Sequence, residues 1–271
     1  MIRVEDALKE TARLGVSMHE FMLDLLPVAR ARARPVISSF AVGAVAQGKT
    51  GGLYLGANVE FPGLALSECV HAEQAAVVNA WTHDEHGLSA LAVTAAPCGY
   101  CRQFLNELVD AEQLHVFVKG AERTTLPALL PASFGPRDLG VTGGLMARTA
   151  RHLTLQGASE PTDPIVAAGL AAASASYAPY TKTYAGVALA TEDGAIVSGR
   201  YAENAAFNPS LSPLQGALAR LAQTLVPYAA IKRAVLVETA GPASQRASSE
   251  AVLGAVAPEV TLEYVRAVEN G

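Results

Sequence analysis

The chain contains one internal repeat, and this repeat constrains the fold more than any other feature of the sequence. Residues 34–43 have an echo in 178–187, which aligns Phe40 with Tyr184 at an offset of 144. Further matches align residues 56–60 with 199–203 at an offset of 143, and residues 71–75 with 213–217 at an offset of 142. The last match sets Gln215 opposite Glu73. A slowly drifting offset indicates two copies of one unit that differ by small deletions.

Both copies predict the same order of helices and strands. Hydrophobic periodicity, interrupted by glycine-containing turns, predicts a helix, two short strands, a helix, a strand, a helix and a final strand. Strands that alternate with helices indicate a layered α/β fold. The expected elements of the first copy are 17–33, 40–47, 52–58, 71–82, 90–95, 98–110 and 114–118. Those of the second copy are 163–176, 184–190, 195–199, 213–225, 233–238, 244–256 and 260–265.

The same pattern divides the chain into four segments. A short helix over 1–14 predicts a small N-terminal extension, and the stretch 119–160, which contains prolines and glycines, indicates an extended connector between the copies. We therefore expect an N-terminal extension over 1–16, a first domain over 17–137, a connector over 138–160 and a second domain over 161–271.

Composition and charge exclude several classes of protein. Half of the residues are hydrophobic and 17% are charged, which is too apolar for a disordered chain. A net charge of −5 argues against a broad surface for nucleic acid. The most apolar stretch, 165–175, is too short for a membrane span, and the start of the chain lacks the apolar core of a signal peptide. The odd count of three cysteines favours a reducing compartment, so the sequence predicts a cytoplasmic protein.

Three residues in the first copy have the spacing of a metal site. His71 opens one predicted helix, and Cys98 and Cys101 form a CxxC pair that opens the next one, 27 residues later. One imidazole and two thiolates give the ligand count of a catalytic zinc, which keeps one coordination position open. A CxxC pair by itself is also typical of thioredoxin-like redox proteins, but a histidine and a glutamate in the same block disfavour that alternative.

Glu73 is the candidate proton carrier of this site. It stands two residues after His71, so its side chain points away from the ligand and toward the open coordination position. A carboxylate so placed can move protons between an activated water and a substrate. The second copy has no histidine or cysteine after His152 and cannot build such a site. We expect Cys69 to be a buried free thiol, and His83 and His86 to lie in a solvated turn.

The motifs His71-Ala72-Glu73 and Pro97-Cys98-Gly99-Tyr100-Cys101 resemble the zinc deaminase signature. The wider sequence is similar to the bacterial two-domain, homodimeric cytidine deaminases. The blocks that carry this resemblance are 39–44, 56–61, 71–74 and 98–103 in the first copy and 205–209 and 213–216 in the second. The resemblance covers nearly the whole chain. It implies a duplicated three-layer α/β/α fold with a degenerate second copy, and a hydrolase that acts on a cyclic amidine C–N bond.

The resemblance also implies roles for individual residues. One Zn2+ per chain would be held in the first domain by His71, Cys98 and Cys101, and Glu73 would carry the proton from the zinc-bound water to N3 of cytosine and then to the departing amine. The products would be uridine or 2′-deoxyuridine and ammonia, within pyrimidine salvage. The substrate would be bound by the ribose contacts Asn58 and Glu60, the packing residue Phe40, the main chain of Ala72 and the pocket-closing Phe134.

Two alternative functions stay open at this stage. The chain could deaminate another amine substrate, such as a nucleotide, an aminopurine or single-stranded nucleic acid, or it could be a catalytically silent module stabilised by zinc. Asn58 and Glu60 argue against a polymer, because a 3′-linked nucleotide cannot offer them a free hydroxyl. The expected partners are a nucleoside and a second copy of the chain, with no nucleic acid and no membrane. We expect the second domain to supply a dimer interface and to shape the active site.

Overall fold

The computed structural model describes residues 1–148, 151–157 and 160–269, which form two compact units. Unit 1 contains Met1–Val59, Val70–Ala147 and Asn204–Pro209, and unit 2 contains the described residues of Glu60–Cys69, Arg148–Glu203 and Ser210–Gly271. Each unit is therefore built mainly from one repeat and includes a short segment of the other.

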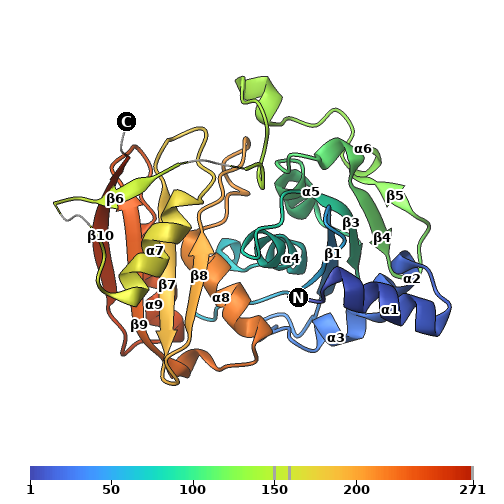
Figure 1. Cartoon of the computed structure of the whole chain (residues 1–271), viewed down its shortest axis with the longest axis horizontal. Helices are drawn as coiled ribbons and strands as arrows, with labels where there is room; N and C mark the ends of the chain where they lie inside the picture. Colours follow the sequence, from blue (N-terminus) through green and yellow to red (C-terminus); the bar gives the residue numbers. More distant parts are fainter. Residues whose placement is uncertain (149–150, 158–159, 270–271) are drawn as a thin grey trace. The chain divides into compact units, whose positions relative to one another are not determined.

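Unit 1 is built on a five-stranded sheet with the order β2-β1-β3-β4-β5 (Figure 1). Only β3 and β4 are parallel neighbours, and the other pairs are antiparallel. The strands are β1 (Gly43–Gly48), β2 (Leu53–Ala57), β3 (Leu88–Val93), β4 (His115–Val118) and β5 (Thr124–Thr125).

Helices cover both faces of this sheet. On one face, α1 (Val4–Leu14), α2 (Met18–Asp24) and α3 (Leu26–Arg30) enclose a core with strand residues such as Val45 and Leu53. On the other face, α4 (Ala72–Trp81) packs against β1 and β2, and α5 (Gly99–Leu105) packs against α4.

The predicted single helix over 17–33 is wrong, because the structure has two short helices there. Ser17 caps α2 by accepting from the Glu20 amide, while the Glu20 carboxylate accepts from the Ser17 amide at 2.7 Å. The chain turns at Leu25, and α3 begins just before Pro27. Proline has no N–H to donate and its ring crowds the preceding turn, so it is tolerated only at a helix start.

A glycine lets α4 approach the sheet closely. A Cβ atom on Gly56 would lie 2.2 Å from the main-chain nitrogen of Ala76 and 2.3 Å from the carbonyl oxygen of Ala72. Gly199 stands in the same relation to the helix of unit 2, where a Cβ atom would lie 2.0 Å from the carbonyl oxygen of Pro213. These contacts are to backbone atoms, which cannot swing aside as a side chain can.

We expect Gly56→Ala to destabilise the protein by about 3 kcal/mol, because the added methyl group forces the helix off the sheet. Gly254→Ala is the matched control, since nothing lies within 4 Å of its Cβ position and it stands inside a helix. That substitution should stabilise the protein by about 1 kcal/mol through helix propensity. Thermal melting of the two variants measures both effects, and a melting temperature of Gly56→Ala equal to that of the parent contradicts the packing argument.

The sheet of unit 2 repeats the order and the directions of the strands in unit 1, except that its edge strand β6 comes first in the chain whereas β5 comes last. This sheet has the order β6-β10-β9-β7-β8, with β9 and β10 as its only parallel pair. The predicted duplication of a three-layer α/β/α fold is therefore confirmed. The strands are β6 (Leu153–Leu155), β7 (Ala185–Thr191), β8 (Ile196–Arg200), β9 (Ile231–Thr239) and β10 (Leu262–Glu269), and the helices are α7 (Pro164–Ser174), α8 (Pro213–Gln223) and α9 (Arg246–Val256).

The stretch 119–160 is not the extended connector that its composition predicts. It contributes β5 to the edge of the first sheet and β6 to the edge of the second, and it contains α6 (Leu126–Leu129). These elements are too short to give a periodic pattern. Within the described ranges, the short 3-10 helices are η1 (Leu66–Glu68), η2 (Ala111–Gln113), η3 (Pro136–Leu139) and η4 (Tyr228–Ala230).

The structure corrects the alignment of the two copies. The bridges Arg34↔Val59 and Tyr177↔Ala202 are equivalent and lie 143 positions apart, so the first offset of 144 is wrong by one. At the start of α4 and α8 the offset is 141, because Gln74 and Gln215 each accept from the amide of the residue that caps the helix. Glu73 is thus matched by Leu214, not by Gln215.

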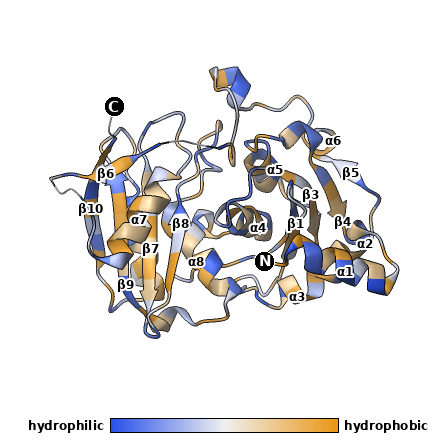
Figure 2. Ribbon diagram, viewed as in Figure 1, coloured by the Kyte–Doolittle hydropathy of each residue, from blue (hydrophilic) through white to orange (hydrophobic). Residues whose placement is uncertain are grey.

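Hydropathy follows the layers of each unit. Figure 2 shows β7 and α7 as mostly hydrophobic, whereas α1 carries hydrophilic residues on the face that points away from the core. Among the described residues, no helix combines the length and the apolar character that crossing a membrane requires.

Candidate metal centre

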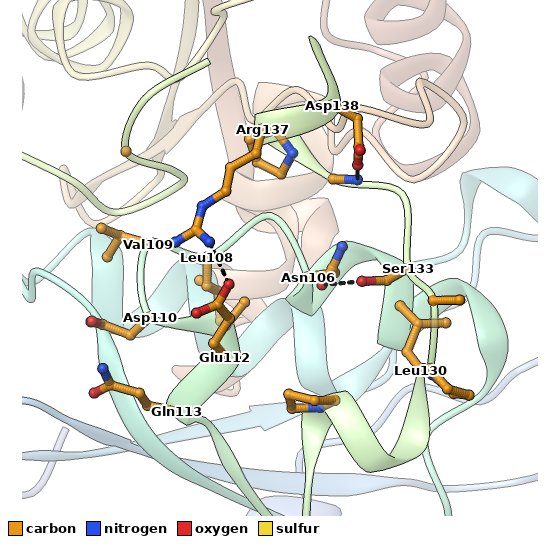
Figure 3. A pocket seen from close by; sticks show the side chains of 17 residues that line it. Asn106, Leu108, Val109, Asp110, Glu112, Gln113, Leu130, Ser133, Arg137 and Asp138 are labelled. Carbon is orange, nitrogen blue, oxygen red and sulfur yellow. Dashed lines mark hydrogen bonds and ion pairs between the residues drawn. The ribbon is translucent and has the colours of Figure 1, made fainter. Parts of the chain in front are cut away.

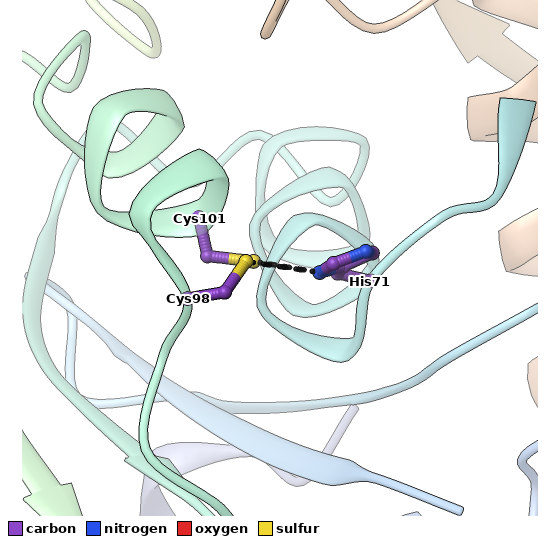
Figure 4. Close-up of side chains that lie close together, drawn as sticks. All are labelled: His71, Cys98 and Cys101. Atoms are coloured by element: carbon purple, nitrogen blue, oxygen red, sulfur yellow. Dashed lines mark hydrogen bonds between the residues drawn. The ribbon is translucent and has the colours of Figure 1, made fainter. Parts of the chain in front are cut away.

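The structure brings together the three residues that the sequence predicts as metal ligands. The Nδ1 atom of His71 lies 3.2 Å from the Sγ atom of Cys101 and 3.5 Å from that of Cys98 (Figure 4). The three ligand atoms lie within 4.8 Å of one another. Figure 4 shows that the imidazole comes from the start of one helix and both sulfur atoms from the start of another.

Helix starts position all three side chains. His71 precedes the first residue of α4, where its amide donates to Gln74 Oε1 at 3.0 Å, and Cys98 precedes the first residue of α5. Cys101 follows three residues later, so it lies on the same face of α5 as Cys98. The free N–H groups and the positive end of a helix dipole favour thiolates at such a position.

A hydrogen bond couples the two thiols of the cluster. The hydrogen bond from Cys101 lowers the pKa of Cys98 to about 4, with a smaller contribution from the His71 charge. The same hydrogen bond and burial raise the pKa of Cys101. Cys98 is therefore the thiol of the pair that ionises more readily, and it stands next to an imidazole nitrogen.

The donor set and its spacing fit zinc. Bonds of about 2.0–2.3 Å in a tetrahedral site separate the ligand atoms by about 3.5–3.8 Å, close to the observed spacing. One nitrogen and two sulfur donors are preferred zinc ligands, and a cation would take the place of the proton between the two thiols. Three ligands leave the fourth position of a tetrahedron open, as in catalytic zinc sites.

Glu73 lies against this cluster. Its side chain is only 4% exposed, and its carboxylate lies beside the Cys101 thiol. Burial raises the pKa of Glu73, and this effect outweighs its hydrogen bonds and the nearby His71 charge, which act in the opposite direction. A buried carboxylate with a raised pKa holds a proton more readily than a free one, which suits a general acid–base.

Arg102 fixes the loop that leads into the CxxC pair. Its Nε atom donates to the carbonyl of Pro97 at 2.8 Å, and its Nη1 atom donates to the carbonyl of Leu129 at 2.7 Å. The sequence suggests Arg102 and Gln74 as hydrogen-bond donors to the thiolates. Arg102 instead donates to main-chain carbonyls, and Gln74 Nε2 is buried with no partner among the described residues.

Asn58 connects β2 to the loop that carries Phe40. Its Oδ1 atom accepts from the amide of Val42 at 2.8 Å, and its Nδ2 atom donates to the carbonyl of Phe40 at 3.0 Å. The side chain is 9% exposed, and its amide has one further N–H to offer. The Phe40 ring is 59% exposed.

The other predicted substrate residues differ in their surroundings. Ala72 is buried at the start of α4, where its main chain adjoins both His71 and Glu73. The Phe134 ring is 47% exposed, and its carbonyl accepts from Gln103 Nε2 at 2.8 Å and from Asn106 Nδ2 at 3.0 Å. Glu60 belongs to unit 2.

Cys69 is not part of the cluster. It is a free thiol, and burial raises its pKa, but the expectation that it is buried is only partly met because the residue is half-buried. His83 and His86 are exposed in the turn after α4, where His83 Nδ1 lies 2.7 Å from the carbonyl oxygen of Asn79. The solvated turn predicted for them is confirmed.

A separate cavity of about 620 Å3 lies in unit 1 (Figure 3). Its lining comes from residues 106–143, and none of the cluster residues contributes to it. Figure 3 shows the pair of Arg137 and Glu112 across its wall, with the Arg137 Nη1 atom 2.6 Å from a Glu112 oxygen, and Asn106 bonded to Ser133. These groups satisfy one another, so the cavity has no arrangement that resembles a reaction centre.

Comparison with known families supports a zinc-binding role for the cluster. A family profile described as "Cytidine and deoxycytidylate deaminase zinc-binding region" matches residues 16–117, and a second profile with the same description matches residues 126–250. The first match contains all three cluster residues, and the second falls on the copy that lacks histidine and cysteine ligands.

Curated relatives match over most of the chain. A cytidine deaminase of Shewanella pealeana is 49% identical over 83% of this chain and 74% of its own length. One of Shewanella oneidensis is 47% identical over 91% of this chain and 82% of its own length. Among solved structures, the cytidine deaminase of Mycobacterium tuberculosis is 31% identical and aligns with 43% of this chain and 96% of its own, with a TM-score of 0.40.

Proposed function

Because the chain belongs to the cytidine deaminase family, we propose that it converts cytidine and 2′-deoxycytidine, with water, into uridine or 2′-deoxyuridine and ammonia, a reaction of pyrimidine salvage. The observation that carries the proposal is the His71–Cys98–Cys101 cluster with the buried Glu73 carboxylate against it. A zinc-dependent hydrolase needs these two parts, three ligands with an open position and a proton carrier beside it.

His71, Cys98 and Cys101 would hold one zinc ion per chain, which supplies Lewis-acid activation of a water molecule near neutral pH. Glu73 accepts a proton from the attacking water as the new C4–O bond forms, and it delivers that proton to N3 of the cytosine ring. It then transfers a second proton to the amino group, so that the C4–N bond breaks and ammonia leaves. The raised pKa of Glu73 suits both directions of transfer.

The substrate contacts follow from the main chain and side chains around the cluster. The Ala72 main chain, next to both His71 and Glu73, would meet the base carbonyl. Phe40 and Phe134 offer exposed rings for the base and sugar. Asn58 and Glu60 would bind the ribose through its 3′-hydroxyl, and Asn58 also holds the Phe40 loop through its two hydrogen bonds.

We expect Asn58→Ala to reduce kcat/KM for cytidine by about 10²-fold or more, and to reduce turnover of free cytosine far less. The variant removes both the sugar contact and the anchor of the Phe40 loop. In sites that hydrogen-bond a substrate hydroxyl, loss of that bond lowers kcat/KM strongly. Steady-state kinetics on the two substrates measures the difference. Equal losses on both would remove the role of Asn58 in sugar recognition.

A panel of amines tests the substrate class. Cytidine, 2′-deoxycytidine, cytosine, cytidine monophosphate, an aminopurine nucleoside and single-stranded DNA are each incubated with the purified protein, and ammonia is measured. The proposal requires the two nucleosides to be preferred. Preference for a nucleotide, an aminopurine or DNA would select the alternative deaminase, and no release from any amine would favour a silent zinc module.

Assembly and location are also part of the proposal. We place the protein in the cytoplasm as a homodimer, in which the second repeat supplies an interface. The three free cysteines suit a reducing compartment. Sedimentation equilibrium would give about twice the chain mass of 28.1 kDa for a dimer, and a single-chain mass would contradict it.

A further inference from the structure

The segment Asn204–Pro209 belongs to the second repeat in sequence but packs within unit 1. Its partner there is α5, the helix that presents Cys98 and Cys101. This helix has only seven residues, and a helix of that length is not stable without tertiary support. The support it receives therefore affects where its two thiols lie.

Asn204 caps the end of α5. Its Nδ2 atom donates to the carbonyl of Gln103 at 2.9 Å, and its Oδ1 atom accepts from Gln103 Nε2 at 3.3 Å. The carbonyls on either side of Gln103 accept hydrogen bonds from main-chain N–H groups of the following turn. Asn204 supplies the donor for the Gln103 carbonyl between them, at the end of the helix. Asn204 is fully buried, and loss of its bonds leaves polar groups without water.

Two further bonds extend this contact along the same side of the helix. The amide of Ala205 donates to Glu107 Oε2 at 2.8 Å, and Glu107 is fully buried. At the other end, the Tyr100 hydroxyl donates to the carbonyl of Asn208 at 3.0 Å. Tyr100 and Gln103 are three residues apart within α5, which places them on one face of the helix, and Glu107 lies in the turn that follows it.

We propose that Asn204 is a positioning residue for the metal centre, and that the segment Asn204–Pro209 fixes α5 so that Cys98 and Cys101 face His71. The proposal builds on the proposed zinc-dependent function. It gives the degenerate second repeat a task that does not require metal ligands of its own: the repeat completes the catalytic unit. Expression of the first repeat alone would remove this segment of unit 1 together with most of unit 2.

The test compares two buried asparagines in the full-length protein. Asn204→Ala removes the cap of α5. Asn79→Ala is the matched control, because Asn79 is also buried in unit 1 and its Nδ2 atom donates to the carbonyl of Leu55 at 2.8 Å, on α4 and away from the ligands. Zinc affinity is measured by competition with a chromogenic chelator, and the ligand geometry by the visible spectrum of the cobalt-substituted protein.

We expect Asn204→Ala to weaken zinc binding by about 10- to 100-fold and to change the cobalt spectrum. Asn79→Ala should lower the melting temperature but keep both metal properties. Parent-like zinc affinity and spectrum in Asn204→Ala would overturn the proposal, and so would an equal loss in Asn79→Ala. Neither readout uses cytidine, so a failure of the proposed reaction would be seen separately.

Tyr100→Phe covers the case in which Asn204→Ala does not fold. It deletes only the hydroxyl that bonds to Asn208 and keeps the ring beside His71, where the ring centroids are 5.8 Å apart. The loss of one hydrogen bond should weaken zinc binding by about two- to tenfold. Unchanged zinc affinity in this folded variant would then overturn the proposal.

Discussion

Replacement of Glu73 by glutamine is expected to lower kcat for cytidine by about 10²- to 10⁴-fold while one zinc per chain remains bound. Glutamine keeps the size of the side chain and one acceptor oxygen, but it cannot take up and release a proton. The carboxylate lies against the Cys101 thiol and is almost fully buried, so no other carboxylate can easily take its place. Steady-state kinetics and metal analysis on the same sample measure the two effects.

Glu112→Gln is the matched control for this experiment. Glu112 is an exposed glutamate of the same unit, paired with Arg137 and remote from the cluster, so its loss should leave kcat unchanged. If Glu73→Gln keeps the parental rate, Glu73 is not the proton carrier. If Glu73→Gln loses zinc as well as activity, the carboxylate supports the metal site, and this variant cannot separate that role from proton transfer. In that case Glu73→Asp, which keeps the carboxylate, must restore zinc binding and part of the rate for the account to hold.

Replacement of Cys101 by serine should remove most of the zinc and lower kcat by about 10³-fold or more. Cys101 is buried beside His71 and Cys98, and a serine hydroxyl is not among the usual ligands of zinc. Cys69→Ser is the matched control, because Cys69 is a free thiol outside the cluster. Metal analysis should find about one zinc per chain in the control, and retention of zinc by Cys101→Ser would exclude Cys101 as a ligand.

The local parts of the metal centre could be predicted from the sequence. The spacing of His71 and the CxxC pair places each ligand at a helix start, and helix starts that follow strands of the same direction lie at one edge of a sheet. Glu73 follows from its position two residues after His71. These inferences use chemistry and short-range geometry only, so the sequence contains all that they require.

The contacts that support the centre could not be predicted. Asn204 stands in a loop more than 100 positions after Gln103, and nothing in the sequence indicates that the two residues pair. Arg102 could be identified as a neighbour of the ligands, but its bond to Leu129 depends on where α6 packs. The alignment error that set Gln215 opposite Glu73 had a similar cause, because hydrogen bonds at the helix start, not residue identity, define the equivalent positions.

The most direct test of the central claim is the release of ammonia from cytidine by the purified full-length protein, with zinc measured on the same sample. The account predicts steady release of ammonia and about one zinc per chain, held by the first repeat. Zinc bound at that ratio with no ammonia from cytidine or 2′-deoxycytidine would contradict the proposed reaction, and steady release from protein that contains no metal would contradict the role of the His71–Cys98–Cys101 cluster.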